Sequence, residues 1–273
     1  MSEKFWRDGP VPATFTPMHE DGSLNLAQKT RFDRDGYVML PGFASPAEVG
    51  EALGVLAKFI HDKVPGLTRE HVFYEDKSRP DTLKQLQSLF LYEPYFDALM
   101  FRSKFAELAE LLLGTPAVGK NMQYFNKPPG IGQPTPPHQD GYYFMLAPCN
   151  ALTMWLALED VDEENGCVRY VRGSHLQAMR PHGRTHVLGF SQGVTDYGTP
   201  EDCANEIAFP AKAGDLLVHH AMTIHRADAN HSPTRTRRAL GFIYYSSRVH
   251  ENVVAKEAYQ RNLAEVMKSE QKI

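Results

Sequence analysis

The sequence predicts a mainly β protein with flanking helices (α+β), in which a β-sandwich or barrel is buttressed by helices near the N-terminus. From Asn121 onward, short segments of β-branched and aromatic residues alternate with turn signals, the pattern of such architectures. Before that point, apolar residues recur at helical spacing between clear helix caps. Because a chain of 273 residues suits one domain of this class, we expect a single domain over 1–273.

The N-terminal part contains a strand and two helices. Residues 1–26 are rich in proline, glycine and polar side chains, and we expect an irregular segment there. An apolar run at 36–43 predicts a strand. Residues 45–48 read Ser-Pro-Ala-Glu, which supplies an N-cap, a proline at the first helical position and a capping-box glutamate, so a helix begins there. A second helix is expected from Ser103 to Gly114, a residue suited to a left-handed helix end.

The β-rich part opens with a strand at 152–158. Alternation along this strand places Thr153, Trp155 and Ala157 on one face. An acidic turn that ends in Asn-Gly leads into a further strand at 167–171, so we expect the two strands to form a hairpin.

The rest of the chain is predicted to hold a long loop, two strands and a helix. Residues 176–206 show little periodicity, and a loop of that length is often a functional lid. Strands are expected at 216–220 and 238–245. Residues 251–273 have a helical composition. This C-terminal helix would pack on the domain or on a second subunit, so a homo-oligomer through it is one expectation.

Composition and charge exclude several classes of function. The formal net charge is −4 with charges interspersed, which indicates neither a nucleic-acid surface nor a polybasic membrane patch. There is no apolar run of membrane-spanning length and no apolar signal core at the start. Cys149, Cys167 and Cys203 show no paired spacing, which favours a reducing compartment. We therefore expect a cytoplasmic protein that acts on a small molecule.

The main chemical signal is His138-Gln139-Asp140, beside a run of aromatic residues. Residues i and i+2 of a strand point to the same face, so His138 and Asp140 can bind one metal ion. His19 and Asp21 have the same spacing but lie in a stretch typical of an acidic turn. A second histidine from a distant strand would complete a two-histidine, one-carboxylate set, which leaves metal positions open and suits non-haem Fe(II) oxygen chemistry.

Six short segments follow one another in an order and approximate spacing typical of one family. They are Arg34-Asp35-Gly36-Tyr37-Val38, Asn126-Lys127-Pro128-Pro129, His138-Gln139-Asp140, Asn165-Gly166-Cys167, Gly173-Ser174-His175 and Gly214-Asp215-Leu216-Leu217. On these segments the chain resembles the phytanoyl-CoA dioxygenase family of Fe(II)- and 2-oxoglutarate-dependent oxygenases, over most of residues 30–245. The resemblance implies a double-stranded β-helix, a jelly-roll or cupin-like barrel with helices on one side, and the period-two pattern favours the same class.

The resemblance also implies the cofactors and the distal metal ligand. Members of the family use Fe(II), 2-oxoglutarate as cosubstrate, and O2. His225, with an asparagine five residues later, matches the family's distal histidine, so His138, Asp140 and His225 are the expected ligands. His219 and His220 compete for this role, but the set needs only one more imidazole, and we expect both to be strand histidines satisfied by their neighbours.

The family also requires a fixed cation for the far carboxylate of 2-oxoglutarate. Arginine suits this task because its planar fork bonds a carboxylate in two places. Arg237 precedes a small-apolar strand start that matches the family, and it is our choice. Arg235 stays open as an alternative, whereas Arg238 on the opposite strand face is expected to be solvated.

Other positions of the cosubstrate pocket are carried over from the resemblance. Trp155 matches a tryptophan that lines the pocket, although a plain core role is open, and Lys84 matches a lysine near the carboxylate, although a solvated helix lysine is open. The remaining expected pocket residues are Thr153, Asn121, Gln123 and Gln139.

The reaction implied by the resemblance is hydroxylation of an unactivated C–H bond of a small molecule, with release of succinate and CO2. Asp140 favours hydroxylation, because related halogenases lack this carboxylate. Residues 142–145 are expected to face the substrate or the core, and Arg172, Arg180 and Arg184 could serve an anionic group. Two alternatives stay open: a divalent-metal hydrolase or isomerase on a cupin-like fold, and a non-catalytic metal-binding module.

Overall fold

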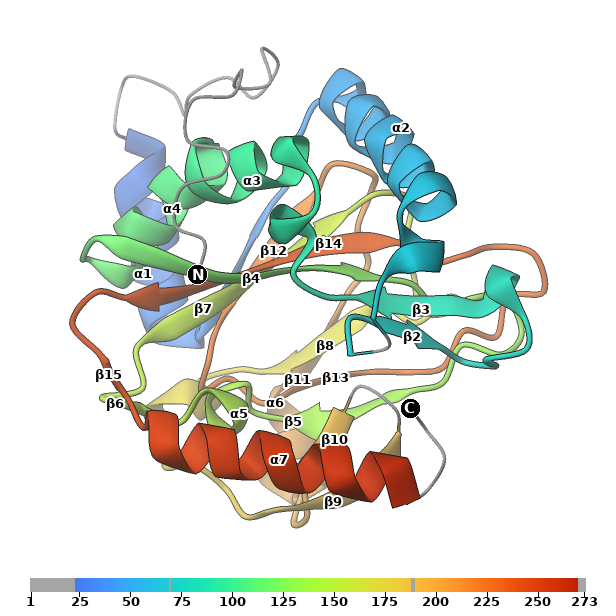
Figure 1. The fold of residues 1–273 in the computed structure, drawn as a ribbon. Coiled ribbons are helices and arrows are strands. Elements are labelled where there is room, and N and C mark those ends of the chain that lie inside the picture. Colours follow the sequence, from blue (N-terminus) through green and yellow to red (C-terminus); the bar gives the residue numbers. More distant parts are fainter. Residues whose placement is uncertain (1–22, 69, 188–189, 270–273) are drawn as a thin grey trace.

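The computed structural model describes residues 23–68, 70–187 and 190–269. Two β-sheets lie face to face, and the α-helices α1 to α4 cover the outer side of the larger sheet (Figure 1). The helices are α1 (Ser23–Asp35), α2 (Pro46–Asp62), η1 (Val64–Gly66), η2 (Pro80–Thr82), η3 (Leu89–Leu91), α3 (Pro94–Phe101), α4 (Lys104–Leu113), α5 (Gly141–Phe144), η4 (Ser174–Leu176), α6 (Pro200–Asn205) and α7 (Val253–Ser269). The expected helical buttress is therefore confirmed.

The larger sheet has seven strands and the smaller one has four. In spatial order, the larger sheet consists of β1 (Tyr37–Leu40), β12 (Leu216–His220), β7 (Ala151–Ala157), β14 (Ala239–Ser246), β4 (Ala117–Phe125), β3 (Leu83–Leu86) and β2 (Val72–Tyr74). The smaller sheet consists of β11 (Glu206–Phe209), β8 (Val168–Val171), β13 (His225–Ala227) and β5 (Thr135–His138). Two short pairs complete the fold: β9 (His182–Val187) with β10 (Phe190–Val194), and β6 (Leu146–Ala147) with β15 (His250–Glu251).

Strand β7 shows how alternation divides the core. Leu152, Met154 and Leu156 belong to the apolar cluster beneath the helices. Trp155 and Ala157 belong to a second cluster, which strands of both sheets build together. The predicted assignment of Trp155 and Ala157 to one face is confirmed, and that face looks into the space between the sheets.

The two helix starts and the one helix end that the sequence defines are confirmed. Ser45 caps α2, and its side chain and that of Glu48 form the predicted capping box. Ser103 caps α4, and Gly114 ends it with φ of 66°. Helix α4 packs on β14 and β4 from outside, where Phe105 stacks on Phe242, and β4 and β14 pair along their whole length.

Two sequence-based expectations about the first 171 residues are wrong, and one motif lies outside the described residues. Helix α1 begins at Ser23, so the segment predicted to be irregular over 1–26 is helical from that residue. Residues 1–22, including His19 and Asp21, lie outside the described residues. Strands β7 and β8 lie in different sheets, so they form no hairpin. The acidic connection is instead fixed by Asn165, whose side chain donates to Asp160 O and to Thr236 O.

Residues 176–206 are more regular than a lid loop. The described part contains the hairpin of β9 and β10 and helix α6, which Thr199 caps with Asp202 as its capping-box partner. This corrects the expectation of a structureless loop, because Thr-Pro-Glu-Asp at 199–202 is a helix start of the same kind as residues 45–48.

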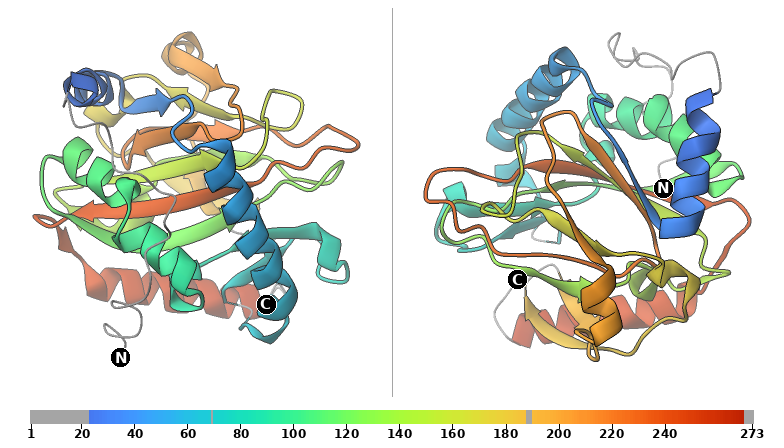
Figure 2. Two further views of the ribbon diagram at one scale, coloured as in Figure 1. Left: turned by 90° about the horizontal axis from the view of Figure 1, so that it is seen from above. Right: turned by 180° about the vertical axis from the view of Figure 1, so that it is seen from behind.

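The C-terminal helix α7 begins at Val253 and packs on its own chain. Figures 1 and 2 show it on the side of the molecule opposite α1 to α4, across the β9–β10 hairpin. Ser191 Oγ and Tyr259 Oη share a hydrogen bond of 2.5 Å, and Lys256 Nζ lies 5.7 Å from the ring centre of Tyr245. Packing on the domain is thus observed, and a homo-oligomer through this helix stays a prediction.

Candidate active site

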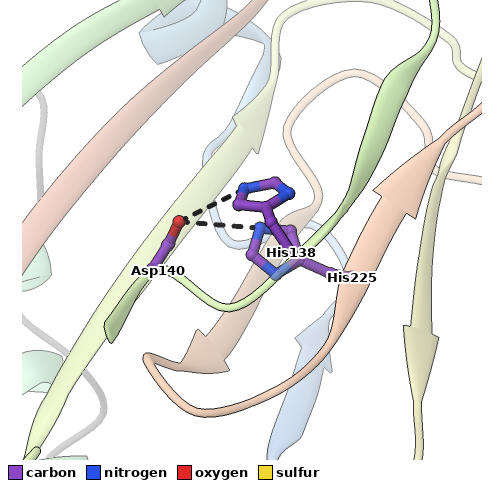
Figure 3. Close-up of side chains that lie close together, drawn as sticks. All are labelled: His138, Asp140 and His225. Carbon is purple, nitrogen blue, oxygen red and sulfur yellow. Dashed lines mark ion pairs between the residues drawn. The ribbon is translucent and has the colours of Figure 1, made fainter. Parts of the chain in front are cut away.

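The three expected metal ligands come together where β5 and β13 pair. His138 at the end of β5 lies directly opposite His225 at the start of β13, with ring centres 4.1 Å apart. The chain then turns at Asp140, whose side chain points back at both rings (Figure 3). One ligand atom from each residue lies within 4.8 Å of the other two. His138 and His225 are 2% and 9% exposed, so the cluster is shielded from solvent.

Backbone carbonyls fix the tautomer of both imidazoles. His138 Nδ1 donates to Pro136 O at 2.8 Å, and His225 Nδ1 donates to Thr223 O at 3.0 Å. Each Nε2 therefore carries a lone pair, and they lie 3.4 and 3.8 Å from Asp140 Oδ1. Burial, and then the imidazoles of His219 and His138, hold the pKa of His225 well below its usual value, so this ring is neutral as metal binding requires.

The carboxylate of Asp140 is held by its other oxygen. Asp140 Oδ2 accepts hydrogen bonds from Thr153 Oγ1 at 2.6 Å and from His219 Nε2 at 3.1 Å. Burial alone would raise the pKa of Asp140, but the imidazoles of His225, His138 and His219 outweigh it and hold the pKa well below its usual range. Asp140 is thus ionised, and its Oδ1 is directed at the two histidine ligands.

His219 supports the carboxylate and is not one of the three clustered ligands. Its Nδ1 accepts a hydrogen bond of 3.1 Å from the hydroxyl of Tyr170, which is fully buried on β8. His220 points to the other side of β12, where its Nδ1 accepts from Met222 N at 3.1 Å and its ring lies beside Phe32. Both histidines are satisfied by neighbours, as expected.

Arg237 is buried without an anionic partner. It is 5% exposed, its Nε has no hydrogen-bond partner, and no carboxylate in the described part of the chain forms an ion pair with it. Its guanidinium carbon lies 5.3 Å from the ring centre of Trp155, also between the sheets. Burial lowers the pKa of Arg237 to about 10, so it stays charged at neutral pH.

The two neighbouring arginines are already paired. Arg235 donates to Asp162 Oδ1 at 2.8 Å and also contacts the carboxylate of Glu164, all on the acidic connection. Arg238 Nε donates to Glu159 Oε2 at 3.0 Å, and its side chain is 38% exposed. Of the three candidates, Arg237 therefore has the surroundings that suit a carboxylate ligand.

Two buried lysines accompany Arg237. Lys84 on β3 is 6% exposed, and its Nζ lies 3.3 Å from the Glu75 carboxylate, so it is not the solvated helix residue. Lys127 lies opposite Arg237, since the two exchange backbone hydrogen bonds of 3.1 and 3.2 Å, and paired residues share a face. Burial and then Arg237 lower the pKa of Lys127. Sequence reasoning missed Lys127, although it lies in the quoted Asn-Lys-Pro-Pro segment.

The expected pocket amides differ in their surroundings. Asn121 and Gln123 alternate with Met122 and Tyr124, which face the helices, so both amides face the space between the sheets. Asn121 Oδ1 accepts from Ser88 N at 3.0 Å, and Gln123 Oε1 accepts from Gln85 Nε2 at 3.4 Å.

Gln139 has a different role from the predicted one. Its Nε2 donates to Met222 O at 2.8 Å and its Oε1 accepts from Arg180 N at 2.9 Å. Both ends of the amide are used within the protein, so Gln139 anchors loops behind β5. Alternation is the reason, because Gln139 points away from the face that His138 and Asp140 share.

The aromatic run after Asp140 connects the metal ligands to the β9–β10 hairpin. Tyr142 stacks on His182 with ring centres 4.3 Å apart, and Tyr143 lies edge-on to His138 at 6.1 Å. Phe144 is buried against Tyr245. The run is thus divided between a core role and a position beside the metal ligands.

Solved structures share this architecture. The epimerase SnoN, crystallised in complex with Fe3+, alpha ketoglutarate and nogalamycin RO, matches with a TM-score of 0.70 and 26% identity over 85% of this chain and 87% of that chain. The alpha-ketoglutarate-dependent carbocyclase SnoK from nogalamycin biosynthesis matches with a TM-score of 0.65 and 25% identity over 83% of this chain and 85% of that chain. EctD from S. alaskensis matches with a TM-score of 0.68 and 20% identity over 86% of this chain and 81% of that chain. At this identity the likeness supports only the shared fold. Fold and site together define a 2-oxoglutarate-dependent non-haem iron oxygenase with a double-stranded β-helix.

The family follows from the sequence comparisons. The model described as Phytanoyl-CoA dioxygenase (PhyH) matches residues 32–239, and the chain belongs to this family. A curated relative, phytanoyl-CoA dioxygenase 1 of Oryza sativa subsp. japonica, is 30% identical over 253 residues, which are 80% of this chain and 88% of the relative. The peroxisomal phytanoyl-CoA dioxygenase of Bos taurus is 23% identical over 241 residues, which are 81% of this chain and 68% of the relative.

None of the helices in the described part of the chain has both the length and the apolar character of a membrane span.

Proposed function

We propose that this oxygenase hydroxylates an unactivated C–H bond of a small-molecule substrate and releases succinate and CO2. The observation that carries the proposal is a pair of incomplete sites beside one another. The buried trio of His138, Asp140 and His225 offers three metal-ligand atoms, and Arg237 is a buried cation without an anion. A metal ion and a dicarboxylate would complete both sites.

His138 Nε2, His225 Nε2 and Asp140 Oδ1 would hold Fe(II), since two imidazoles and one carboxylate fit this ion and leave positions open. When bound together, iron and 2-oxoglutarate supply the activation of O2. The protein's part is orientation. Thr153 and His219 hold Asp140 Oδ2, which keeps Oδ1 directed at the metal position.

Arg237 would bind the far carboxylate of 2-oxoglutarate through its planar fork. Trp155 lies against the guanidinium and excludes water from it, which strengthens the ion pair. Lys84 lies in the same buried region, where its charge is paired with the carboxylate of Glu75, so Arg237 is the cation left for the dianion. A zinc hydrolase or a bare binding module has no use for this buried cation.

The anaerobic formation of the Fe(II)·2-oxoglutarate complex tests the cofactor assignment. Apoprotein receives Fe(II) and then 2-oxoglutarate, and the visible metal-to-ligand charge-transfer band of a chelated keto acid is recorded. The band should form in the native chain and in the matched control Arg238→Ala, and should weaken in Arg237→Ala. An Arg235→Ala variant that weakens it instead would transfer the role to Arg235. If Fe(II) binds and no band forms, the proposal fails.

The outcome of the reaction needs a separate measurement. Asp140 occupies the position that a halide would need, which supports hydroxylation. SnoN is an epimerase and SnoK a carbocyclase, so products must be examined by mass. A gain of one oxygen from O2, with one succinate per product, is the expected result. A product of unchanged mass or one lighter by two hydrogens would contradict hydroxylation while leaving the cofactors in place.

Two further expectations remain proposals: a cytoplasmic location and a homo-oligomer through the C-terminal helix. A cytoplasmic location rests on the sequence alone, and the relative from Bos taurus is named as peroxisomal. Fractionation of the native host, followed by immunodetection, distinguishes the two compartments.

A further inference from the structure

Three tyrosine rings form a chain of contacts from the metal ligands to the C-terminal helix. Tyr143 lies edge-on to the ligand His138 at 6.1 Å, to Tyr142 at 6.0 Å and to Tyr259 of α7 at 6.4 Å. All three tyrosines are half-buried. We call Tyr142, Tyr143 and Tyr259 the tyrosine wall. It lies on the β9–β10 side of the metal ligands, whereas Arg237 and Trp155 lie between the sheets.

The hydroxyls of two wall residues are used within the protein. Tyr143 Oη donates to Gln192 O at 2.6 Å and accepts from Gln192 N at 3.1 Å, and Tyr259 Oη bonds Ser191 Oγ at 2.5 Å. What these two residues can offer a ligand is ring surface.

Two arginines in this part of the molecule, Arg180 and Arg226, are already paired with carboxylates of the protein. Arg180 pairs with Asp196 at 3.0 Å and Asp202 at 2.7 Å. Arg226 on β13 pairs with Glu206 at 2.7 Å and Asp228 at 2.5 Å. The cations described over nearby rings, Lys120 and Lys256, lie over Tyr245 and not over the wall. A coenzyme A thioester carries several phosphate charges, which normally need arginine or lysine partners.

Resting on the proposed function, we infer that the tyrosine wall recognises an uncharged substrate with a flat apolar face, such as an aromatic or fused ring, and not an acyl-coenzyme A thioester. Tyr259 is the specificity-determining residue. The family match ends at residue 239, so Tyr259 on α7 lies outside it, whereas Tyr142 and Tyr143 lie within it. Aromatic faces stack on such rings without needing charge.

Two probes of opposite chemistry test the inference on the anaerobic Fe(II)·2-oxoglutarate enzyme. Binding of the neutral aromatic N-phenyl-1-naphthylamine is followed by its fluorescence, and binding of free coenzyme A by calorimetry. We expect the first probe to bind and the second to give no heat. Tyr259→Ala should lower the affinity for the aromatic probe about tenfold or more, because one ring of the wall is lost. Glu257→Gln, on an exposed position of the same helix, is the matched control and should bind as the native chain does.

Tyr259→Phe separates recognition from a structural link. It keeps the ring and removes only the hydrogen bond to Ser191, so we expect probe affinity within about twofold of the native value. If Tyr259→Phe loses as much affinity as Tyr259→Ala, the residue only ties α7 to β10 and the inference is overturned. Binding of coenzyme A, or no binding of the aromatic probe, overturns it as well.

The charge-transfer band formed by Fe(II) and 2-oxoglutarate provides the separate readout. It requires no substrate, so it should form equally in the native chain, Tyr259→Ala and Tyr259→Phe. A missing band in the native chain contradicts the proposed function. A normal band with a contrary probe result contradicts only the tyrosine wall.

Discussion

The carboxylate of Asp140 and the guanidinium of Arg237 have opposite surroundings. Asp140 is enclosed by three imidazoles and a threonine hydroxyl, so its hydrogen-bond partners are already in place in the folded chain. Arg237 is just as deeply enclosed but has an aromatic face on one side and no described carboxylate. One charge is positioned by the protein, whereas the other is kept ready for a ligand.

This difference indicates which part of the site lowers the stability of the apoprotein and which part determines metal affinity. A buried charge without a partner is costly, often by several kcal/mol. The protein is therefore less stable while Arg237 has no anionic partner, and a ligand that binds Arg237 would restore this stability. Around Asp140 the polar network is complete except where a metal would bind, so disruption there should act on metal affinity first.

Replacing Asp140 with alanine should have the largest effect. It removes one metal ligand and leaves Thr153 Oγ1 and His219 Nε2 without their acceptor. Because removal of outer partners alone costs about 10- to 100-fold in metal affinity, loss of the ligand should exceed this, and hydroxylated product should disappear. Fe(II) titration and product analysis check both. Asp160→Ala, an exposed carboxylate, is the control, and unchanged product in Asp140→Ala would refute the assignment.

Replacing Arg237 with methionine should weaken 2-oxoglutarate binding about 100-fold, the loss expected for a charged two-point hydrogen bond. The free energy of unfolding of the apoprotein should stay unchanged or rise by about 1 kcal/mol, since a bare buried charge becomes an apolar side chain. Calorimetric binding and urea unfolding measure the two quantities. Arg238→Met, which breaks the pair with Glu159, is the control.

A marked loss of apoprotein stability in Arg237→Met would show that the guanidinium is paired within the protein, and the comparison with Asp140 would fail. The native chain should also melt at higher temperature with 2-oxoglutarate present, whereas Arg237→Met should not, because a ligand stabilises only the state that binds it.

Local signals of the sequence were sufficient for the parts that depend on local chemistry. The capping box at 45–48, the glycine end of α4 and the faces of β7 follow from spacing along one segment, and the structure confirms them. The same rule applied at 199–202 would have found α6. The ligand trio came from a short motif joined to a resemblance, and the structure brings its members together.

What the sequence could not supply are relations between distant segments. Nothing in the turn after β7 says that the next strand joins the other sheet, because a hairpin and a crossover share the same turn residues. The bond from Tyr170 to His219 joins residues 49 positions apart, and no spacing rule indicates it. Thr153 was expected to line the cosubstrate pocket, whereas the structure shows its hydroxyl bonded to Asp140.

Replacing His219 with leucine should lower Fe(II) affinity about tenfold or more, because Asp140 loses one of the two donors to Oδ2. His220→Leu is a stringent control: it changes the next residue of the same strand, on the face away from the metal ligands. Equal losses of Fe(II) affinity in the two variants would mean that damage to β12, and not the hydrogen bond, is responsible.

Replacing Thr153 with valine should have the smallest effect and decides between two roles for this residue. Valine keeps the shape and removes one hydrogen bond to Asp140 Oδ2, so Fe(II) affinity should fall about fivefold, equivalent to roughly 1 kcal/mol. Thr153→Ser, which keeps the hydroxyl, should bind Fe(II) normally. If Thr153 instead acted on the cosubstrate, Fe(II) affinity would be unchanged and 2-oxoglutarate affinity would fall. Combined with His219→Leu, the loss should differ from the sum of the single losses, because both donors act on one oxygen.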